Sequence, residues 1–469
     1  MEPHETRSSM TVPRQQRQAG SLAAPAARPV EHNGAGRFLL RTLFWGGFAL
    51  ALLPWWLGTK PGSIDTTAEI FQSAGRVTGL IAGYLLLMQI ILMSRLSVLE
   101  RWIGARHLGL WHRELGGSVL ITILAHAALI TVGYAYADRV GFVSELGTIL
   151  TEYEDMVTAF LAAGMLVCIG LLSIRGLRRA LPYELWYFLH LTAYLALLLG
   201  FAHQFSNGQE LFKPGLGRTL WTVFYVVMIC AVAWGRVVAP LTLNLRHRLR
   251  VADVVAEGPD MVSIYITGNR LHDLDAQAGQ FFRWRFLSRG LWWQAHPFSL
   301  SAAPNGRWLR LTVKTVGSHT NALRDLRPGV RIFVEGPWGD FTASRRVKSR
   351  TVLIAAGSGI APIRALLEEL PPGAVVIYRA SAVHDLHLRD ELEHLAELRH
   401  ATLWFVVGDR RDPGPRRLFT PTGMRELVPD ITERDIYLCG PDGLVTQSLQ
   451  VLRRLRVPRR QIHLDPFEF

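Results

Sequence analysis

The chain has 469 residues, of which 49% are hydrophobic, and a formal net charge of +13. Its length allows two to four domains, and its three cysteines exclude a disulfide framework or a cysteine-rich zinc site. The excess positive charge lies largely in arginines beside apolar segments, which indicates contact with anionic lipid. The chain contains no recognisable nucleic-acid module, so we expect no nucleic-acid partner.

Residues 1–36 are polar and lack hydrophobic periodicity, so we expect a disordered N-terminal tail. Six later segments each contain roughly 20 mostly apolar residues, which is enough to span a membrane. They lie near residues 38–58, 74–94, 113–135, 157–175, 185–205 and 218–240. The sequence therefore predicts an α-helical bundle of six spans in a transmembrane domain over 37–240.

The charges of the connections predict an orientation. The connections after the second and fourth spans and the segment after the sixth are rich in arginine, whereas the alternate connections are acidic. Arginine-rich connections stay in the cytoplasm. We therefore expect a multi-pass protein of the cell membrane with both termini and the C-terminal half in the cytoplasm.

Four histidines lie inside the apolar segments, in two pairs. His112 and His126 are on the third span, and His190 and His203 are on the fifth. An ionisable side chain within a membrane is costly and suggests function, and neutral imidazole is a common axial ligand of heme iron. One such histidine is more often a hydrogen-bonded core residue. Two pairs with similar spacing favour two hemes stacked across the bilayer.

The spacing of the two pairs differs by one residue. Fourteen steps rotate an ideal helix by about 320° beyond full turns, so His112 and His126 share a face. Thirteen steps of ~100° place His190 and His203 on different faces. Either the fifth helix is irregular near Gly200, or the second heme is rotated relative to the first, and the sequence leaves both possibilities open.

Beyond Pro240 the hydrophobic pattern changes. Short alternating strands separated by glycine and proline turns predict an antiparallel β-barrel over 245–345. From Thr351, strands alternate with helices, which predicts an α/β doubly wound parallel sheet over 350–469.

The predicted barrel carries two motifs. In residues 296–299, HPFS, an aromatic side chain beside a hydroxyl could flank a flavin ring and bond to its N5 atom. Residues 314–320, KTVGSHT, offer charge, hydroxyls and a free backbone to a diphosphate. The alternative for the second motif is a strand-to-helix cap made by Thr320.

The predicted α/β domain carries three further candidates. Gly357 and Gly359 would let a pyrophosphate approach a helix N-terminus, and Pro362 suits the first helical turn; a plain tight turn is the alternative. Cys439 ends a later strand at the sheet edge where ligands bind, although it could simply be buried before a turn. A residue that binds the ribose 2′-hydroxyl of NADH is typically acidic. At the corresponding place this chain has Arg379 and Ser381, which favour NADPH over NADH.

These motifs, in this order and with a final Phe469, resemble the ferredoxin–NADP reductase superfamily. Joined to six spans with two histidine pairs, the chain resembles the NADPH oxidase and ferric reductase family in a bacterial form, over residues 38–469. The resemblance implies electron transfer from cytoplasmic NADPH through FAD and two b-type hemes to an extracytoplasmic acceptor. We expect that acceptor to be O2, giving superoxide; a ferric chelate, or a partner protein supplied by an electron-donating heme module, are the alternatives.

The resemblance also implies residue roles. His112 with His190 would bind the inner heme, and His126 with His203 the outer heme. Cys439 would border the nicotinamide, Phe469 would stack on the flavin, and Arg76 would lie near the outer heme. The complete predicted set for FAD and NADPH is His296, Pro297, Phe298, Ser299, Lys314, Gly317, Ser318, Thr320, Gly357, Gly359, Pro362, Arg379, Ser381, Cys439 and Gly440.

The chain departs from the family pattern at three positions. Family loops often read Gly-Asp-Trp-Thr where this chain has Gly-Ser-His-Thr over 317–320, and Ser299 replaces a frequent threonine. No calcium-binding loop of alternating carboxylates is present, so calcium control is not expected.

Overall fold

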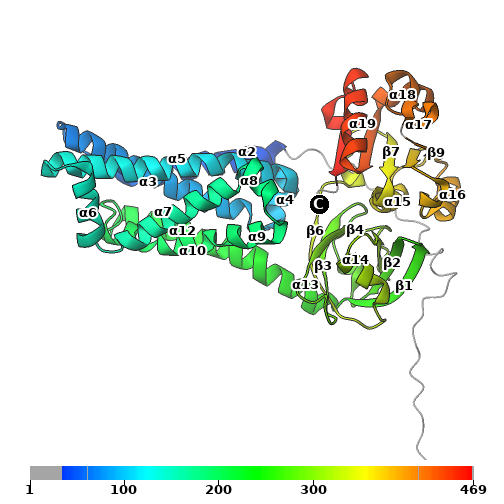
Figure 1. Ribbon diagram of the computed structural model, residues 1–469, viewed down its shortest axis with the longest axis horizontal. Coiled ribbons are helices and arrows are strands. Elements are labelled where there is room, and N and C mark those ends of the chain that lie inside the picture. The colour runs from blue at the N-terminus through cyan, green and yellow to red at the C-terminus, as the bar shows by residue number, and fades with distance from the viewer. Residues whose placement is uncertain (1–33, 61, 410, 467–469) are drawn as a thin grey trace, which may run out of the picture. The chain divides into compact units, whose positions relative to one another are not determined.

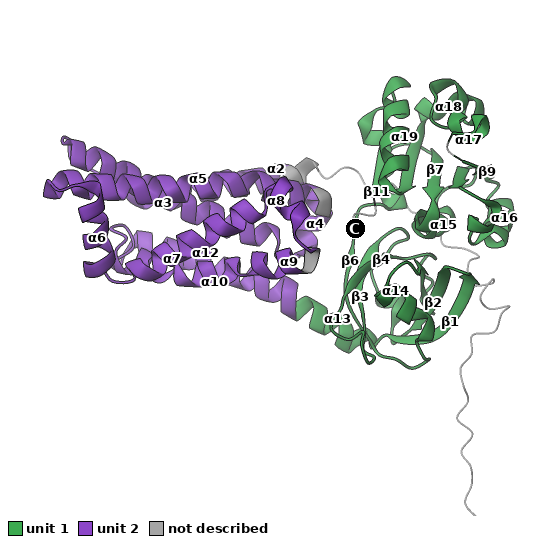
Figure 2. Ribbon diagram, in the orientation of Figure 1, with its two compact units in different colours: residues 1–33, 238–469 green, residues 34–237 purple. Residues whose placement is uncertain are grey.

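The computed structural model describes residues 34–60, 62–409 and 411–466. The chain divides into two compact units, one formed by residues 34–237 and the other by the described residues from 238 onwards (Figures 1 and 2). Residues 1–33 of the predicted tail lie outside the described residues. Residues 34–36, also expected to be disordered, already belong to the first helix.

The first unit is entirely helical among its described residues. Its second helix begins with a capping box, in which the Thr66 hydroxyl accepts from the Glu69 amide and the Glu69 carboxylate accepts from the Thr66 amide. The helices are α2 (Gly34–Gly58), α3 (Thr67–Leu92), α4 (Ser97–Ile103), α5 (Ala105–Asp138), α6 (Phe142–Glu152), α7 (Met156–Leu172), α8 (Arg175–Ala180), α9 (Tyr183–Leu191), α10 (Ala193–Leu199), α11 (Ala202–Ser206) and α12 (Leu216–Ala233).

Helix α12 continues without a break into the second unit. A π-helical turn, Trp234–Val238, leads into α13 (Ala239–His247). A Cβ atom at Gly235 would lie 2.0 Å from the Ser94 carbonyl oxygen, so only glycine fits this close approach. Pro240, where the hydrophobic pattern changes, therefore lies within this helical run, in the first turn of α13 and directly after the π-helical turn.

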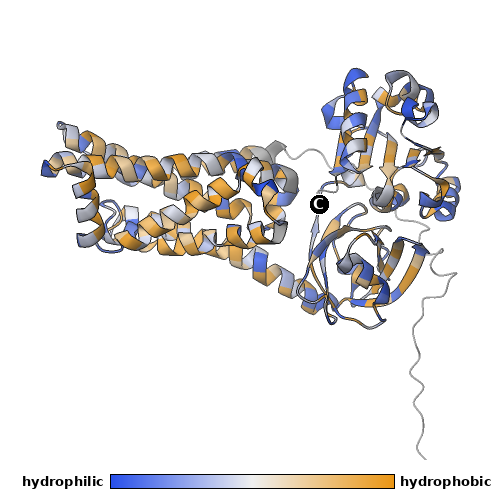
Figure 3. Ribbon diagram, viewed as in Figure 1, coloured by the Kyte–Doolittle hydropathy of each residue, from blue (hydrophilic) through white to orange (hydrophobic). Residues whose placement is uncertain are grey.

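Hydrophobic residues predominate along the helices of this unit, as Figure 3 shows. Large side chains such as Trp56, Ile121 and Leu198 are 72%, 70% and 69% exposed, which in water would leave a large unpaired apolar surface. Among the described helices, five are long and apolar enough to cross a membrane. The predicted span 157–175 corresponds to α7, which has 17 residues and is bent by 115° from α6, so six spans result only if this bent pair counts as one.

The fifth predicted span is irregular. It is divided into α9, α10 and α11, with breaks at Thr192 and at Gly200–Phe201. Near the second break, Phe201 and Gln204 donate their amides to carbonyls only three residues back, at 3.3 Å. These tighter turns change the rotation per residue. Of the two explanations for the 13-residue spacing, the structure contains the irregular helix near Gly200.

The second unit begins with two antiparallel sheets of three strands each. The first has the order β1 (Arg250–Gly258), β2 (Met261–Thr267), β5 (Leu309–Lys314), and the second has β4 (His296–Ser299), β3 (Phe281–Phe286), β6 (Ile332–Trp338). In β3, Phe282, Trp284 and Phe286 are buried at alternate positions, as a strand facing a core requires. The predicted barrel is not closed, because among the described strands only isolated bridges, such as Leu300 with Leu311, join the two sheets.

The remaining strands form one parallel sheet, as predicted. The order is β11 (Ile462–Pro466), β10 (Arg434–Gly440), β7 (Arg350–Ala356), β8 (Val375–Ala380), β9 (Thr402–Val407). Helices α15 (Ile360–Glu369) and α16 (Arg389–Leu398) pack on one face, and α18 (Pro421–Leu427) and α19 (Asp442–Arg454) pack on the other. The sheet is therefore doubly wound, and the winding direction reverses between β7 and β10, where such sheets bind ligands.

Candidate functional site

The four membrane histidines meet in the pairs that the sequence analysis expected. The ring centroids of His112 and His190 are 5.8 Å apart. His126 and His203 together line one cavity, which has a volume of about 250 Å³. Early residues thus pair with early, and late with late. The break near Gly200 allows this arrangement despite the unequal spacing.

The two histidines of α5 are oriented by carbonyl groups of α3. His126 Nδ1 lies 2.8 Å from the Gly75 carbonyl oxygen, and His112 Nδ1 lies 3.2 Å from that of Gln89. A carbonyl can only accept, so each Nδ1 carries the proton and each Nε2 keeps a lone pair for a metal. A Cβ atom at Gly79 would lie 2.6 Å from His126 Nδ1, so this glycine makes room for the ring.

The donor set suits heme rather than a bare metal ion. No cluster of three or more histidine, cysteine or acidic side chains that could hold a metal occurs within the part of the chain that the structure describes. A pair of imidazoles would suit a heme, whose iron brings its other ligands with it. Glycines 79, 83 and 200 line the cavity of His126 and His203, and a Cβ at Gly83 would lie 2.8 Å from the Trp221 ring.

Arg76 lines this cavity. Other polar residues that line it include Gln72 on α3 and Asn207, Gln209 and Glu210 after α11, and the part of the cavity that they form is called its polar end. Its Nη1 atom donates to Gln209 Oε1 at 2.6 Å and to Glu210 Oε1 at 3.2 Å. The structure thus brings Arg76 to the cavity of His126 and His203, and it adds a glutamate that the sequence analysis had not singled out.

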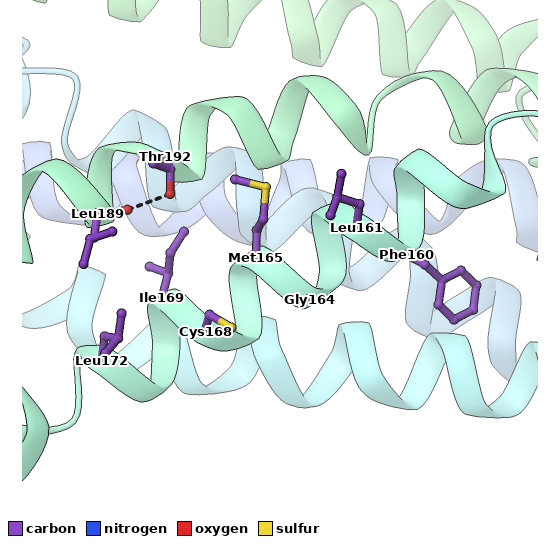
Figure 4. Close-up of a pocket in the computed structure, with 9 residues that line it drawn as sticks. All are labelled: Phe160, Leu161, Gly164, Met165, Cys168, Ile169, Leu172, Leu189 and Thr192. Atoms are coloured by element: carbon purple, nitrogen blue, oxygen red, sulfur yellow. Dashed lines mark hydrogen bonds between the residues drawn. The ribbon is translucent and has the colours of Figure 1, made fainter.

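A second cavity lies between α7 and the α9–α10 break, with a volume of about 380 Å³ (Figure 4). Its walls are apolar apart from Cys168 and Thr192, and the Thr192 hydroxyl donates to the Leu189 carbonyl at 2.7 Å. It contains no histidine or carboxylate among its lining residues. The cavity of His126 and His203 is therefore the candidate site of the helical unit.

In the second unit, two predicted residues meet where the doubly wound sheet reverses direction. A Cβ atom at Gly359 would lie 2.3 Å from the Cys439 carbonyl oxygen, so the turn after β7 packs directly against the end of β10. Gly357 has φ +56° and Gly440 has φ +155°, conformations that favour glycine. Pro362 lies in the first turn of α15. Backbone N–H groups at this reversal suit a phosphate.

Cys439 and Ser299 both contact Asp465, a residue that the sequence analysis missed: Ser299 contacts its carboxylate and Cys439 its backbone carbonyl. The Ser299 hydroxyl donates to Asp465 Oδ2 at 3.2 Å, and Cys439 Sγ lies 3.1 Å from the Asp465 carbonyl oxygen. Burial raises the pKa of Asp465 to about 7 and that of the Cys439 thiol well above its usual value. An acidic residue at the end of the short last strand, Ile462–Pro466, was the available signal for Asp465.

The two barrel motifs also meet. The ring centroids of His296 and His319 are 3.9 Å apart, and burial, with His296 close by, lowers the pKa of His319 to about 4. The Thr320 hydroxyl accepts from the amides of Val316 and Gly317, each at 3.0 Å. This is the strand-to-helix cap that was the alternative role for Thr320, at the start of α14 (Ser318–Ala322).

Two predicted charged residues have protein partners. Lys314 Nζ lies 3.1 Å from Asp260 Oδ2. The Arg379 guanidinium donates to the carbonyls of Val406, at 3.3 Å, and Gly408, at 2.6 Å, at the carboxyl edge of the parallel sheet. Exposed Ser381 directly follows β8 at that edge. Phe469 lies outside the described residues.

Comparison with known proteins identifies three parts of the chain. Residues 78–201 match the ferric reductase like transmembrane component, residues 246–342 match an FAD-binding domain, and residues 353–449 match the oxidoreductase NAD-binding domain. An NADPH oxidoreductase of Mycobacterium tuberculosis is 27% identical over 239 residues, which are 49% of this chain and 62% of that protein. A flavohemoprotein of Pseudomonas aeruginosa is 32% identical over 238 residues, which are 47% of this chain and 58% of that protein.

The chain therefore spans less than two thirds of the length of these relatives. Among solved structures, the FAD- and NAD-binding domain of a nitric oxide dioxygenase from Vibrio cholerae is 24% identical, with a TM-score of 0.39 over 47% of this chain and 98% of that one. With a ferric reductase-like transmembrane component, an FAD-binding domain and an NAD-binding domain in one chain, the protein is an oxidoreductase with the architecture of the NADPH oxidase and ferric reductase family.

Proposed function

We propose that the protein transfers electrons from cytoplasmic NADPH across the cell membrane to O2, giving superoxide. In this proposal, residues 37–240 bind two b-type hemes, residues 245–345 bind FAD and residues 350–469 bind NADPH. When bound, FAD would accept a hydride and the hemes would pass its electrons singly across the bilayer. One NADPH supplies two electrons, so two O2 would become two superoxide ions with release of one proton.

The observation that carries the proposal is the geometry of the histidine pairs. His112 and His126 are each fixed by a carbonyl of α3 with Nε2 available, and each has its partner from the other helix nearby. A histidine held only for packing would not need a second imidazole opposite it. The conserved hydrogen bond at the far nitrogen of a metal-bound histidine is a general device for setting its tautomer and orientation.

The choice of NADPH rests on the carboxyl edge of the parallel sheet. Arg379 is held at that edge by carbonyls of the strand and loop beside it, and Ser381 follows two residues later. A cation and a hydroxyl suit a 2′-phosphate better than a 2′,3′-diol. The arginine-rich connections of the helical unit support a cytoplasmic position for the nucleotide-binding half.

The choice of O2 rests on the size of the cavity around His126 and His203. Pockets that hold drug-sized ligands have volumes of about 300–1,000 Å³, whereas this cavity has about 250 Å³ and would also receive part of a heme. A small acceptor therefore fits better than a ferric chelate. The polar side chains at one end, including Arg76, are the feature that favours a chelate.

NADPH-driven cytochrome c reduction by the purified full chain, with and without superoxide dismutase, tests the acceptor. We expect the dismutase to suppress most of the reduction. Undiminished reduction, together with fast reduction of ferric EDTA under argon, would refute O2 as the acceptor and support a ferric reductase. Absence of heme from the purified protein would refute the whole electron path.

A further inference from the structure

One wall of the His126 and His203 cavity is lined by loop 207–211, the first five of the nine residues that connect α11 and α12. The loop is tightly packed. A Cβ atom at Gly208 would lie 2.2 Å from the Gln204 carbonyl oxygen, and one at Gly217 would lie 2.2 Å from the Glu210 carbonyl oxygen. Leu211 is only 4% exposed and belongs to the core of the helical unit.

Side-chain contacts tie this loop to two other parts of the bundle. Asn207 Nδ2 donates to the Glu154 carbonyl at 2.6 Å, between α6 and α7. Arg76, on α3, donates to the side chains of Gln209 and Glu210. Since all five loop residues line the cavity, these contacts hold a wall of the cavity in place.

The Arg76–Glu210 pair is the strongest of these ties because it is charged and partly buried. The two side chains are 23% and 9% exposed, so the pair is screened less than one on the open surface. Removing one partner of a buried pair leaves the other charge without compensation. We expect the loop to lose its position when Glu210 is removed, and the cavity wall to open.

We infer that the Arg76–Glu210 pair is a selectivity clamp: it holds loop 207–211 across the cavity so that a small neutral acceptor enters and a ferric chelate does not. This inference rests on the proposed electron path and goes beyond it, since it assigns the exclusion of large acceptors to one ion pair. Glu210 is a specificity-determining residue here and takes no part in ligating iron.

The test compares acceptors in the full chain reconstituted in nanodiscs. Rates of superoxide formation in air and of ferric EDTA reduction under argon are measured for the wild type, Glu210→Ala, Glu210→Gln and Gln209→Ala. Hydrogen exchange of peptides covering 205–215 is measured on the same proteins. Glu152→Ala is the matched control, because Glu152 is an exposed acid at the end of α6 and not among the cavity-lining residues.

We expect Glu210→Ala to raise the ratio of ferric EDTA reduction to superoxide formation by about tenfold and to speed exchange in 205–215. Glu210→Gln, which keeps a hydrogen-bonding group, should have a smaller effect in the same direction, and Glu152→Ala should match the wild type. Heme content, read from the optical spectrum, should stay at the wild-type value in all variants.

Three results would overturn the clamp. The first is an unchanged acceptor ratio in Glu210→Ala with hemes retained. The second is loss of heme from all three variants of Glu210 and Gln209, which would make the pair a structural tie only. The third is a wild type that already reduces ferric EDTA faster than O2, which would leave the transmembrane electron path intact while removing the selectivity.

Discussion

The two units of this chain use interior polar groups for different purposes. In the helical unit, large apolar side chains face outward, and histidines, an arginine and a glutamate gather around one cavity. In the second unit, a group of interior charges forms a network of ion pairs instead. Arg310, Arg364 and Glu368 are 2%, 3% and 5% exposed there. The buried charges of the helical unit therefore mark a candidate site, whereas this network of the second unit is architectural.

The network in the second unit links the strand region to the α/β region. Arg310 donates to both Glu391 oxygens, at 3.0 and 2.9 Å. Arg364 pairs with Glu391 at 2.5 Å and with Glu368 at 2.6 Å, and Glu368 accepts from the Ala303 amide at 2.5 Å. Each charge has an opposite partner, which is the condition under which a buried charge is tolerated.

The largest expected effect is in the helical unit. On the proposed electron path, His126→Ala should remove one of the two hemes and stop electron transfer across the membrane, while reduction of FAD by NADPH continues, because His126 would be a ligand of that heme and the second unit is untouched. Heme stoichiometry by the pyridine hemochrome assay and flavin bleaching by NADPH measure the two halves. If the variant retained both hemes, His126 would not be a heme ligand, and the cavity of the helical unit would no longer differ from the charge network of the second unit in function.

Removing a network charge should destabilise the second unit instead. Glu391→Ala leaves two buried guanidinium groups with fewer partners, which should lower the free energy of unfolding by about 3 kcal/mol. Glu393→Ala is the control, because its pair with Arg389 is exposed and should be worth less than about 0.5 kcal/mol. The stability of both variants is measured by thermal unfolding, with the release of flavin as the signal. Equal losses in the two variants would show that the network is not structural.

Asp465 predicts a pH dependence of stability. Burial raises its pKa from 3.8 to about 7, so the folded state holds a proton that the unfolded state lacks between these values. Stability should therefore fall as pH rises through this window, by at most about 1.4 kcal/mol per pH unit. Asp465→Asn should flatten that slope in thermal unfolding from pH 5 to 8. A slope equal to the wild type would place the titration elsewhere.

The smallest expected effect concerns the nucleotide. Arg379→Ala should reduce the preference for NADPH over NADH by roughly 10- to 100-fold, since one charge-assisted contact is worth ~1.5–3 kcal/mol. The ratio of kcat/KM for flavin reduction by the two nucleotides measures it, with Arg399→Ala as an arginine control away from the sheet edge. Unchanged selectivity would mean that Arg379 serves only the carbonyls of Val406 and Gly408.

The sequence alone was enough to predict the elements whose pattern has a single physical solution. Long apolar segments can only be buried or lie in lipid, so the spans were predictable, and the alternation of strands and helices after Thr351 admits little besides a doubly wound sheet. The histidine pairs were visible because histidine is rare in such segments.

The tertiary structure decided what depends on contacts between distant segments. It placed Asp465 beside Ser299, because the pairing of Cys439 with Asp465 across β10 and β11 cannot be seen in either strand alone. It joined Arg76 to Glu210, 134 residues apart. It also showed the break near Gly200 that brings His203 to the cavity of His126. Local patterns determine which elements form, whereas side-chain packing between them determines which polar groups meet.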